Sequence, residues 1–281
     1  MEKDFIPRLK RLLFYIVMLI IAATMLYPFL WAVSASFKTT QQLYNGNPLN
    51  LIPAPFTWWN YQRALVLLPF PRFLMNSAFL SVTVPALMLL FASLAAYAFA
   101  KLRFKGKNLI FLLLLGTMMI PTVVTLIPNY VLIRKLGWIN NYLALVIPPL
   151  FGGANVFNLF FLRQYFLSIP KDLEDAAIID GCSRFRVFLK IVMPNAKPAL
   201  ATVGILSFNV QWNSFLWPLI VINDYMKMPV QVGLSFFKGI ASNWGELLAG
   251  TTLTIIPMLA VFLIFQKYFV KSIVNTGFGG Q

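Results

Sequence analysis

Long apolar stretches without a charged residue recur along the chain and predict six transmembrane helices. A helix needs about 20 mostly apolar residues to cross the hydrocarbon core of a bilayer, and six charge-free stretches are long enough. These stretches are Leu12–Phe37, Phe73–Ala100, Asn108–Ile133, Leu136–Leu162, Pro198–Asn223 and Leu247–Gln266. We therefore expect an all-α membrane protein with these six spans.

Two stretches need a separate interpretation. The charge-free stretch 39–62 is rich in Asn and Pro, which interrupt regular helices, so we expect an irregular loop there. The first span, Leu12–Phe37, has a signal peptide as its alternative. The apolar core of a signal peptide is only about 7–15 residues long, and this stretch is longer, which favours a membrane span.

The positions of Lys and Arg predict the orientation, because cytoplasmic loops of membrane proteins carry an excess of them. With the N-terminus in the cytoplasm, 16 of the 23 Lys and Arg residues fall inside and seven fall outside. The prediction is a cytoplasmic N-terminus (1–11), a six-helix domain (12–270) with a cytoplasmic loop (164–197), and a cytoplasmic C-terminal tail (271–281). The loops 38–72 and 224–246 are then extracytoplasmic.

The composition agrees with a membrane protein and argues against a water-soluble domain, a nucleic-acid partner and an intrachain disulfide. Of the 281 residues 59% are hydrophobic and 11% charged, with a mean hydropathy of +0.77, which is too little charge to cover a water-soluble domain. The net charge of +15 lies in short clusters between apolar runs, as anionic lipid headgroups require, so no nucleic-acid partner is expected. A single cysteine, Cys182, excludes an intrachain disulfide.

The membrane spans lack the side chains that catalysis or proton transport would need. The chain contains no His, and no span carries Asp, Glu, Lys or Arg in its core, which argues against an enzyme, a metal site and a proton-coupled pump. The Gly106-Lys107 pair is followed by Asn108 and does not form a phosphate loop. If the protein moves a solute uphill, the energy comes from another subunit, and this chain binds no cofactor.

Prolines recur inside the predicted spans, where they kink helices. Two explanations stay open: helices that bend around a pathway, or ordinary kinked packing. The prolines are Pro85, Pro121, Pro128, Pro148, Pro149, Pro218 and Pro257.

The predicted cytoplasmic segment 164–197 has the pattern of two short helices joined by a turn. Ser168 with Pro170 is expected to start the first helix, acids fill its first turns, and Gly181 ends it. Ser183 is expected to cap the second helix and Pro194 to stop it. The alternative is an amphipathic loop on the lipid headgroups, but four acids near an anionic membrane argue against it.

This segment resembles a motif of binding-protein-dependent ABC importers, whose permease subunits carry E-A-A, three residues, G, nine residues and I-x-L-P in a cytoplasmic loop. Here the order is Asp175-Ala176-Ala177, Gly181 after three residues, Ile191 after nine, and Met193-Pro194. Asp175 replaces Glu but follows Glu174, and Met193 replaces Leu. The extended motif is most similar to the carbohydrate-uptake branch, that is, to the second, six-helix subunit of the maltose permease.

Four further segments along the chain are similar to the same family. They are Tyr27–Trp31, Ala96–Phe104, Trp212–Leu219 and Gln266–Val270.

The resemblance implies a type I ABC importer permease fold and a non-catalytic role. The substrate would be a sugar, an oligosaccharide or a related polyol or glycerol phosphate, imported at the expense of ATP. The implied partners are a second permease subunit, two copies of a cytoplasmic ABC ATPase that uses ATP and Mg²⁺, an extracytoplasmic solute-binding protein and membrane lipid. The implied location is the bacterial cytoplasmic (inner) membrane.

The resemblance also assigns roles to residues of the loop 164–197. Glu174 and Asp175 would face basic groups of the ATPase, Ala176 and Ala177 would permit close docking, and Gly181 would form the bend. The full set of implied coupling residues is Glu174, Asp175, Ala176, Ala177, Asp180, Gly181, Ile191 and Pro194.

Polar residues in the fifth span are candidates for substrate contact, since amides beside indole rings suit sugar hydroxyls and sugar faces. The alternative is helix–helix hydrogen bonding, a common use of Asn and Gln in bundles. The candidates are Asn209, Gln211, Trp212, Asn213 and Ser214, with Asn76, Asn155 and Asn158 as weaker ones.

The loop 224–246 is a candidate contact for the binding protein by the same resemblance, with an interfacial cap held by its aromatic residues as the alternative. The candidate residues are Phe236, Phe237, Asn243 and Trp244.

A secondary transporter of a small polar solute is the alternative function. It would account for kinked helices but not for the motif, and we find neither an internal repeat nor buried ionisable residues in the sequence.

Overall fold

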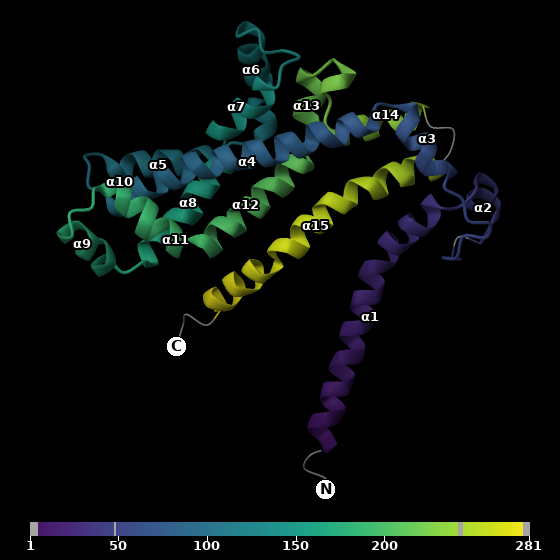
Figure 1. Cartoon of the computed structure of the whole chain (residues 1–281), viewed down its shortest axis with the longest axis horizontal. Coiled ribbons are helices and arrows are strands. Elements are labelled where there is room, and N and C mark those ends of the chain that lie inside the picture. Colours follow the sequence, from purple (N-terminus) through teal and green to yellow (C-terminus); the bar gives the residue numbers. More distant parts are fainter. Residues whose placement is uncertain (1–4, 48, 241–243, 278–281) are drawn as a thin grey trace. The chain divides into compact units, whose positions relative to one another are not determined.

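The computed structural model describes residues 5–47, 49–240 and 244–277, which fold into helices joined by loops (Figure 1). No β-strand occurs in these three ranges. The chain divides into two compact units, 1–70 with 234–255 and 71–233 with 256–281.

Helices of the first unit come from the N-terminal part of the chain: α1 (Phe5–Ser36), α2 (Thr40–Asn45) and α3 (Trp59–Leu67). Three helices contribute to both units: α4 (Phe70–Lys101), α14 (Val230–Ile240) and α15 (Trp244–Gly277). The second unit holds α5 (Lys107–Thr117), α6 (Thr122–Lys135), α7 (Leu143–Phe151), α8 (Gly153–Ser168), α9 (Lys171–Ile179), α10 (Arg184–Val187), η2 (Phe188–Val192), α11 (Met193–Asn195), α12 (Lys197–Trp212), α13 (Leu216–Val221) and η3 (Tyr225–Lys227).

Three of the six predicted spans are single helices that are long and apolar enough to cross a membrane. They are Lys10–Ser36, Phe70–Lys101 and Trp244–Gln266, within α1, α4 and α15. They correspond to the first, second and sixth predicted spans.

The third and fourth predicted spans are bent pairs rather than single helices. The axes of α5 and α6 differ by 97°, and those of α7 and α8 by 47°. The first break precedes α6 at Pro121, where the missing N–H and the restricted preceding residue end a helix. The second break lies at Gly152, whose backbone is extended. With each bent pair as one span, the structure has up to six spans.

The fifth predicted span, 198–223, is wrong as a continuous helix. It is divided into α12, of 16 residues, and the short α13, with a break at 213–215. The bent pair that is long and apolar enough to span is Arg184–Asn195 with Lys197–Trp212, at 79°.

The predicted loop 39–62 is irregular at 46–58 but also contains α2 and the start of α3. Thr39 begins α2 with a capping box, in which its side chain accepts from Gln42 N and its own N–H donates to Gln42 Oε1. Asn60 in α3 donates from Nδ2 to the carbonyls of Ser36 and Lys38, each at 2.8 Å. This buried amide fixes α3 against the end of α1.

The core of the second unit combines small and large apolar side chains. Ala92 and Ala96 of α4 are buried in one cluster with Phe166 of α8, Val203 of α12 and Val192 of η2. Small side chains let helices approach closely, which is how helices associate in lipid. This cluster joins α4 to the segment that contains the motif.

Candidate functional site

We call residues 164–197 the motif segment. Its helix α9 begins directly after Pro170, with Asp172 and Glu174 in the first turn. Carboxylates there complement the positive end of the helix dipole. Ser168 is not its cap, contrary to the prediction, because its hydroxyl donates to the carbonyl of Tyr165 at 2.7 Å and so closes the end of α8.

The end of α9 follows the prediction that Gly181 forms the bend. Gly181 has a φ of +82°, in the left-handed region that favours glycine. Its N–H donates to the carbonyl of Ile178 at 3.0 Å, and the N–H of Cys182 donates to that of Ala177 at 2.9 Å. These two bonds are the Schellman motif, which satisfies the last carbonyls of a helix.

The second helix of the segment begins as predicted and continues further than predicted. The Ser183 hydroxyl accepts from the Arg186 N–H at 3.3 Å and caps α10. Pro194 does not stop the helical run, which continues through the π-helical turn η2 into α11 and ends at Asn195. Pro194 lies directly after the π-helical turn η2, an irregularity of the kind at which a helix tolerates a missing N–H.

The two acids of the motif point in different directions. Glu174 is only 2% exposed, and its Oε1 lies 2.6 Å from Nζ of Lys101. Asp175 is exposed and lies 3.5 Å from Lys171 Nζ, one turn earlier. The expectation that Glu174 faces outward therefore differs from the structure, because the helical period places it beside Ala177 on the buried face.

The exposed face of α9 carries Asp175, Ala176 and Ile179, and the Ile179 side chain is 86% exposed. Asp180 and Gly181 at the bend are exposed too. On the following helical run Phe185 and Leu189 are large exposed apolar side chains. The segment thus presents exposed apolar side chains together with two exposed acids on α9, Asp172 and Asp175.

Other motif residues have mixed positions. Pro194 is exposed, Ile191 is half-buried and Ala177 is buried. Small Ala177 therefore packs inside the segment rather than on its surface.

The structure brings Asn209 and Asn213 together and adds a residue that sequence reasoning missed. Asn213 Nδ2 donates to the Asn209 carbonyl at 3.0 Å and to its side-chain Oδ1 at 3.1 Å. Its own Oδ1 accepts from Gln231 Nε2 at 3.3 Å. Asn209 and Asn213 are exposed and Gln231 is half-buried, so three amides form one accessible cluster. We call Asn209, Asn213 and Gln231 the amide cluster.

The remaining fifth-span candidates are less exposed. Trp212 is buried and stacks on Phe208 at 5.8 Å between ring centroids, while Gln211 and Ser214 are half-buried. Trp212 therefore packs within the unit and does not lie beside the exposed amides as an open indole face.

Two of the weaker candidates make helix–helix hydrogen bonds. Asn158 of α8 donates from Nδ2 to the Ser207 hydroxyl of α12 at 3.0 Å, and Asn155 Nδ2 donates to the Leu150 carbonyl at 2.8 Å. Both amides are buried, so at these positions the bundle-packing interpretation holds.

The candidate binding-protein contacts differ in how exposed they are. Trp244 is exposed, Phe236 is half-buried, and Asn243 lies outside the described residues. Phe237 is fully buried and meets Phe70 edge to face, with 5.7 Å between ring centroids. The prediction of a surface role for Phe237 is therefore wrong, because α14 turns this ring into the first unit.

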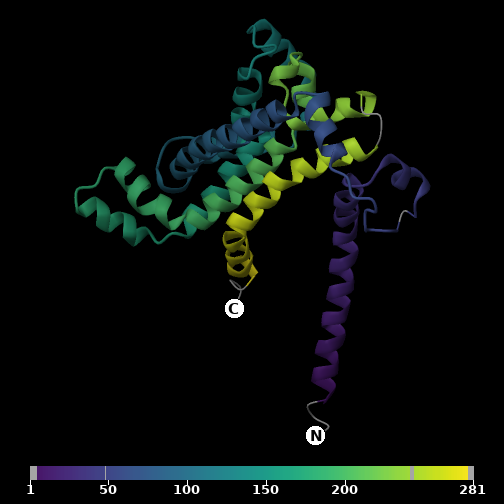
Figure 2. The same ribbon diagram turned by 45° about the vertical axis from the view of Figure 1, so that its right-hand side comes forward.

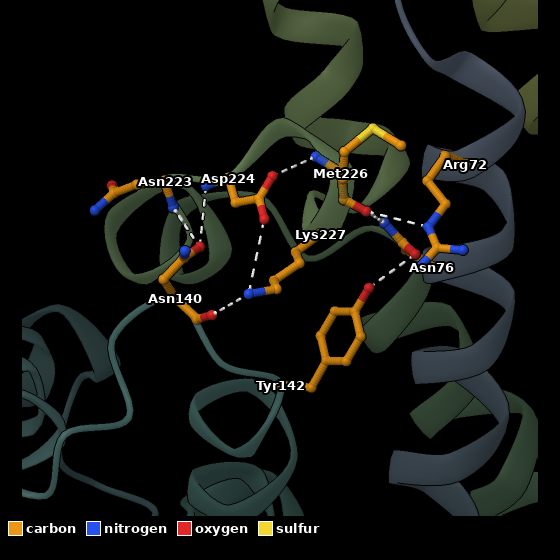
Figure 3. Close-up of polar contacts among 8 residues, drawn as sticks. All are labelled: Arg72, Asn76, Asn140, Tyr142, Asn223, Asp224, Met226 and Lys227. Carbon is orange, nitrogen blue, oxygen red and sulfur yellow. Dashed lines mark hydrogen bonds and ion pairs between the residues drawn. The ribbon is translucent and has the colours of Figure 1, made fainter.

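A polar cluster near the N-terminal end of α4, shown in Figure 3, was not predicted. Asn140 has a φ of 61°, and its side-chain Oδ1 accepts from the N–H groups of Asn223 and Asp224 at 3.3 and 3.0 Å. Its carbonyl accepts from Lys227 Nζ at 3.1 Å. One asparagine in a tight turn thus ties the α6–α7 connection to the loop 222–229.

No group of three His, Cys, Asp or Glu that could hold a metal ion is present in 5–47, 49–240 and 244–277.

Comparison with known families decides the assignment. Residues 88–275 match the family of binding-protein-dependent transport system inner membrane components. The chain belongs to this family. The match includes the whole motif segment, the third to sixth predicted spans and the C-terminal part of the second. The chain is a membrane protein of the ABC transporter permease class.

Relatives that are similar along almost their whole length support the same family assignment. The chain is 37% identical to the arabinooligosaccharides transport system permease protein AraQ of Halalkalibacterium halodurans, over 92% of this chain and 93% of that one. It is 34% identical to the trehalose/maltose transport system permease protein MalG of Thermococcus litoralis, over 97% and 98%. A solved bacterial ABC transporter that imports alginate superposes with a TM-score of 0.81 and 27% identity, over 95% and 98%.

Proposed function

We propose that this protein is one permease subunit of an ATP-driven, binding-protein-dependent importer of a sugar or oligosaccharide. The observation that carries the proposal is the motif segment, two helices joined at Gly181, in a chain of this family. The named relatives carry arabinooligosaccharides, trehalose and maltose, which supports a carbohydrate substrate. The subunit itself does no chemistry, and ATP with Mg²⁺ is used by a partner ATPase.

The proposed orientation places both termini and the segment 164–197 in the cytoplasm of a bacterial inner membrane. It is supported by the excess of Lys and Arg on that side. The complex would contain a second permease subunit, two ATPase subunits and an extracytoplasmic binding protein.

The exposed surface of α9 and α10 is the proposed docking site for the ATPase. Ile179 and Phe185 are apolar anchors of the kind that dominate interfaces, and the small, exposed Ala176, three residues before Ile179 on α9, allows close approach. Asp175 adds a negative charge that suits a basic partner surface.

The amide cluster of Asn209, Asn213 and Gln231 is the proposed substrate contact of this subunit. Amides donate and accept at once, which matches the hydroxyl groups of a sugar. Loss of the Asn213 side chain is expected to raise the KM for uptake and to leave basal ATP hydrolysis unchanged.

Co-purification tests the docking surface. Ile179→Asp places a charge in the proposed interface and is expected to release the ATPase from the purified complex. The matched control is Ile52→Asp, because Ile52 is also highly exposed (73%) but lies in the loop 46–58, on the predicted extracytoplasmic side. Retention of the ATPase by Ile179→Asp at the level of the Ile52→Asp control would contradict the proposed surface.

A further inference from the structure

An almost fully buried ion pair joins the motif segment to α4. Nζ of Lys101, the last residue of α4, lies 2.6 Å from Oε1 of Glu174, and the two side chains are 9% and 3% exposed. The same Nζ donates to the Ile169 carbonyl at 2.8 Å, two residues before α9 begins. One lysine thus holds the start of α9 against the end of α4.

Two further cations fix the end of α4. Arg163 of α8 donates from Nε to the Phe99 carbonyl at 3.1 Å, and Lys107 donates from Nζ to the Leu102 carbonyl at 2.9 Å. Cations at the carboxyl end of a helix are favourable because they meet its negative dipole end. The end of α4 is therefore a firm anchor for α9.

The other end of α4 holds a second segment through one buried amide. Asn76 is 4% exposed, and its Nδ2 donates to the carbonyls of Met226 and Met228 at 2.9 and 3.0 Å. Its Oδ1 accepts from the Tyr142 hydroxyl at 2.8 Å (Figure 3). Tyr142 directly precedes α7.

Nearby contacts strengthen this second junction. Arg72 Nε donates to the same Met226 carbonyl at 3.2 Å, and the N–H of Val230 donates to the Ser77 hydroxyl at 2.8 Å. Together with Asn140, they hold the loop 222–229 along its length.

The single helix α4 connects the Lys101–Glu174 ion pair to the hydrogen bonds of Asn76. Asn76 and Lys101 are about 38 Å apart along α4 at the rise of an α-helix. Figures 1 and 2 show α9 and α10 near one end of α4 and α13 towards the other. Pro85 removes one internal hydrogen bond, but α4 continues without a break from Phe70 to Lys101.

We propose that α4 transmits a displacement of α9 to the loop 222–229, with Lys101, Glu174 and Asn76 as positioning residues. The inference rests on the proposed function, in which α9 docks on the ATPase. If α9 moved without α4, Lys101 and Glu174 would separate and leave uncompensated buried charges, which is strongly unfavourable. α4 therefore follows α9, and Asn76 moves the loop 222–229 with it.

Hydrogen–deuterium exchange on the purified complex, with its ATPase and second permease in nanodiscs, tests this inference. Exchange is compared with and without ATP and orthovanadate. In the native protein the nucleotide is expected to change exchange at 171–182 and at 222–229. In Glu174→Gln and Asn76→Leu, the change at 222–229 is expected to fall at least fivefold, while that at 171–182 persists.

Two controls separate positioning from stability. Asn158→Leu removes an equally buried amide elsewhere in the unit and is expected to keep both responses. Lys101→Met combined with Glu174→Leu removes both charges, so stability is expected to recover, while the response at 222–229 stays lost.

Three outcomes have different meanings. A full response at 222–229 in the Lys101→Met, Glu174→Leu protein would overturn the inference. A native protein that responds at 171–182 but not at 222–229 would overturn it too, and would leave the proposed function standing. No response at 171–182 in the native complex would contradict the proposed function itself, and the inference with it.

Discussion

Substitution of Gly181 tests how strongly local stability and uptake depend on the bend of the motif segment. A Cβ built at Gly181 meets no atom within 4 Å, so the substitution has no steric cost from neighbours. The cost comes from the backbone, because a non-glycine residue in the left-handed region loses about 1–2 kcal/mol. This free energy corresponds to roughly a 5- to 30-fold smaller population of the bent conformation.

The expected readout is local amide exchange together with uptake. In Gly181→Ala the Schellman bond of Cys182 opens more often, so its amide exchange accelerates by about 5- to 30-fold. Uptake falls in parallel. Gly181→Leu behaves like Gly181→Ala, since there is open space around the site. Gly181→Asn lies closer to the native protein, because Asn tolerates this conformation.

The matched control is Gly116→Ala, because Gly116 is also without a neighbour within 4 Å but lies inside α5. There alanine is expected to leave exchange at Cys182 and uptake unchanged. Native exchange at Cys182 in Gly181→Ala would show that the left-handed backbone at this position has no such cost. A Leu variant with much faster exchange than the Ala variant would show that neighbouring atoms, rather than the backbone, set the cost.

Two further substitutions test packing in the second unit. A Cβ at Gly233 would lie 2.1 Å from the buried Phe73 ring, so Gly233→Ala is expected to lose about 1–3 kcal/mol. The thermal midpoint in detergent should fall well below that of Gly204→Ala, whose nearest neighbour is a flexible methyl at 3.3 Å; equal midpoints would contradict this. Asn158→Leu is expected to lose about 0.6–2 kcal/mol of stability, and a second substitution, Ser207→Ala, should add little, as a double-mutant cycle of thermal midpoints would show.

Features encoded by short stretches of sequence were predicted from those stretches. The α1, α4 and α15 spans follow from local hydropathy, and the αL turn at Gly181 and the Ser183 cap follow from residue type and spacing. These elements depend on neighbours within a few positions. Family resemblance at the motif then supplied the class of transporter.

Features set by distant contacts were not predictable. Glu174 shows this, because its burial depends on Lys101, which belongs to another helix. Gln231 joins the amide cluster only because α14 lies beside the end of α12. Phe237 is similar, since the side of α14 that is buried depends on Phe70.

Helix breaks are an intermediate case. Pro121 marked the α5–α6 break in the sequence, but its 97° bend has no signature there. The break at 213–215 contains no proline or glycine and was missed, since apolar neighbours on both sides continue the hydropathy of a span. Hydropathy therefore locates a span more reliably than it predicts a continuous helix.

Uptake into proteoliposomes tests whether this chain imports a carbohydrate only when a partner hydrolyses ATP. The complex with its partners is reconstituted with the binding protein and offered radiolabelled maltose, trehalose and arabinotriose. We expect uptake of at least one sugar that needs ATP and Mg²⁺ on the side of the ATPase and is lost in Ile179→Asp. Uptake driven by a proton or sodium gradient without ATP would contradict this expectation and would favour a secondary transporter.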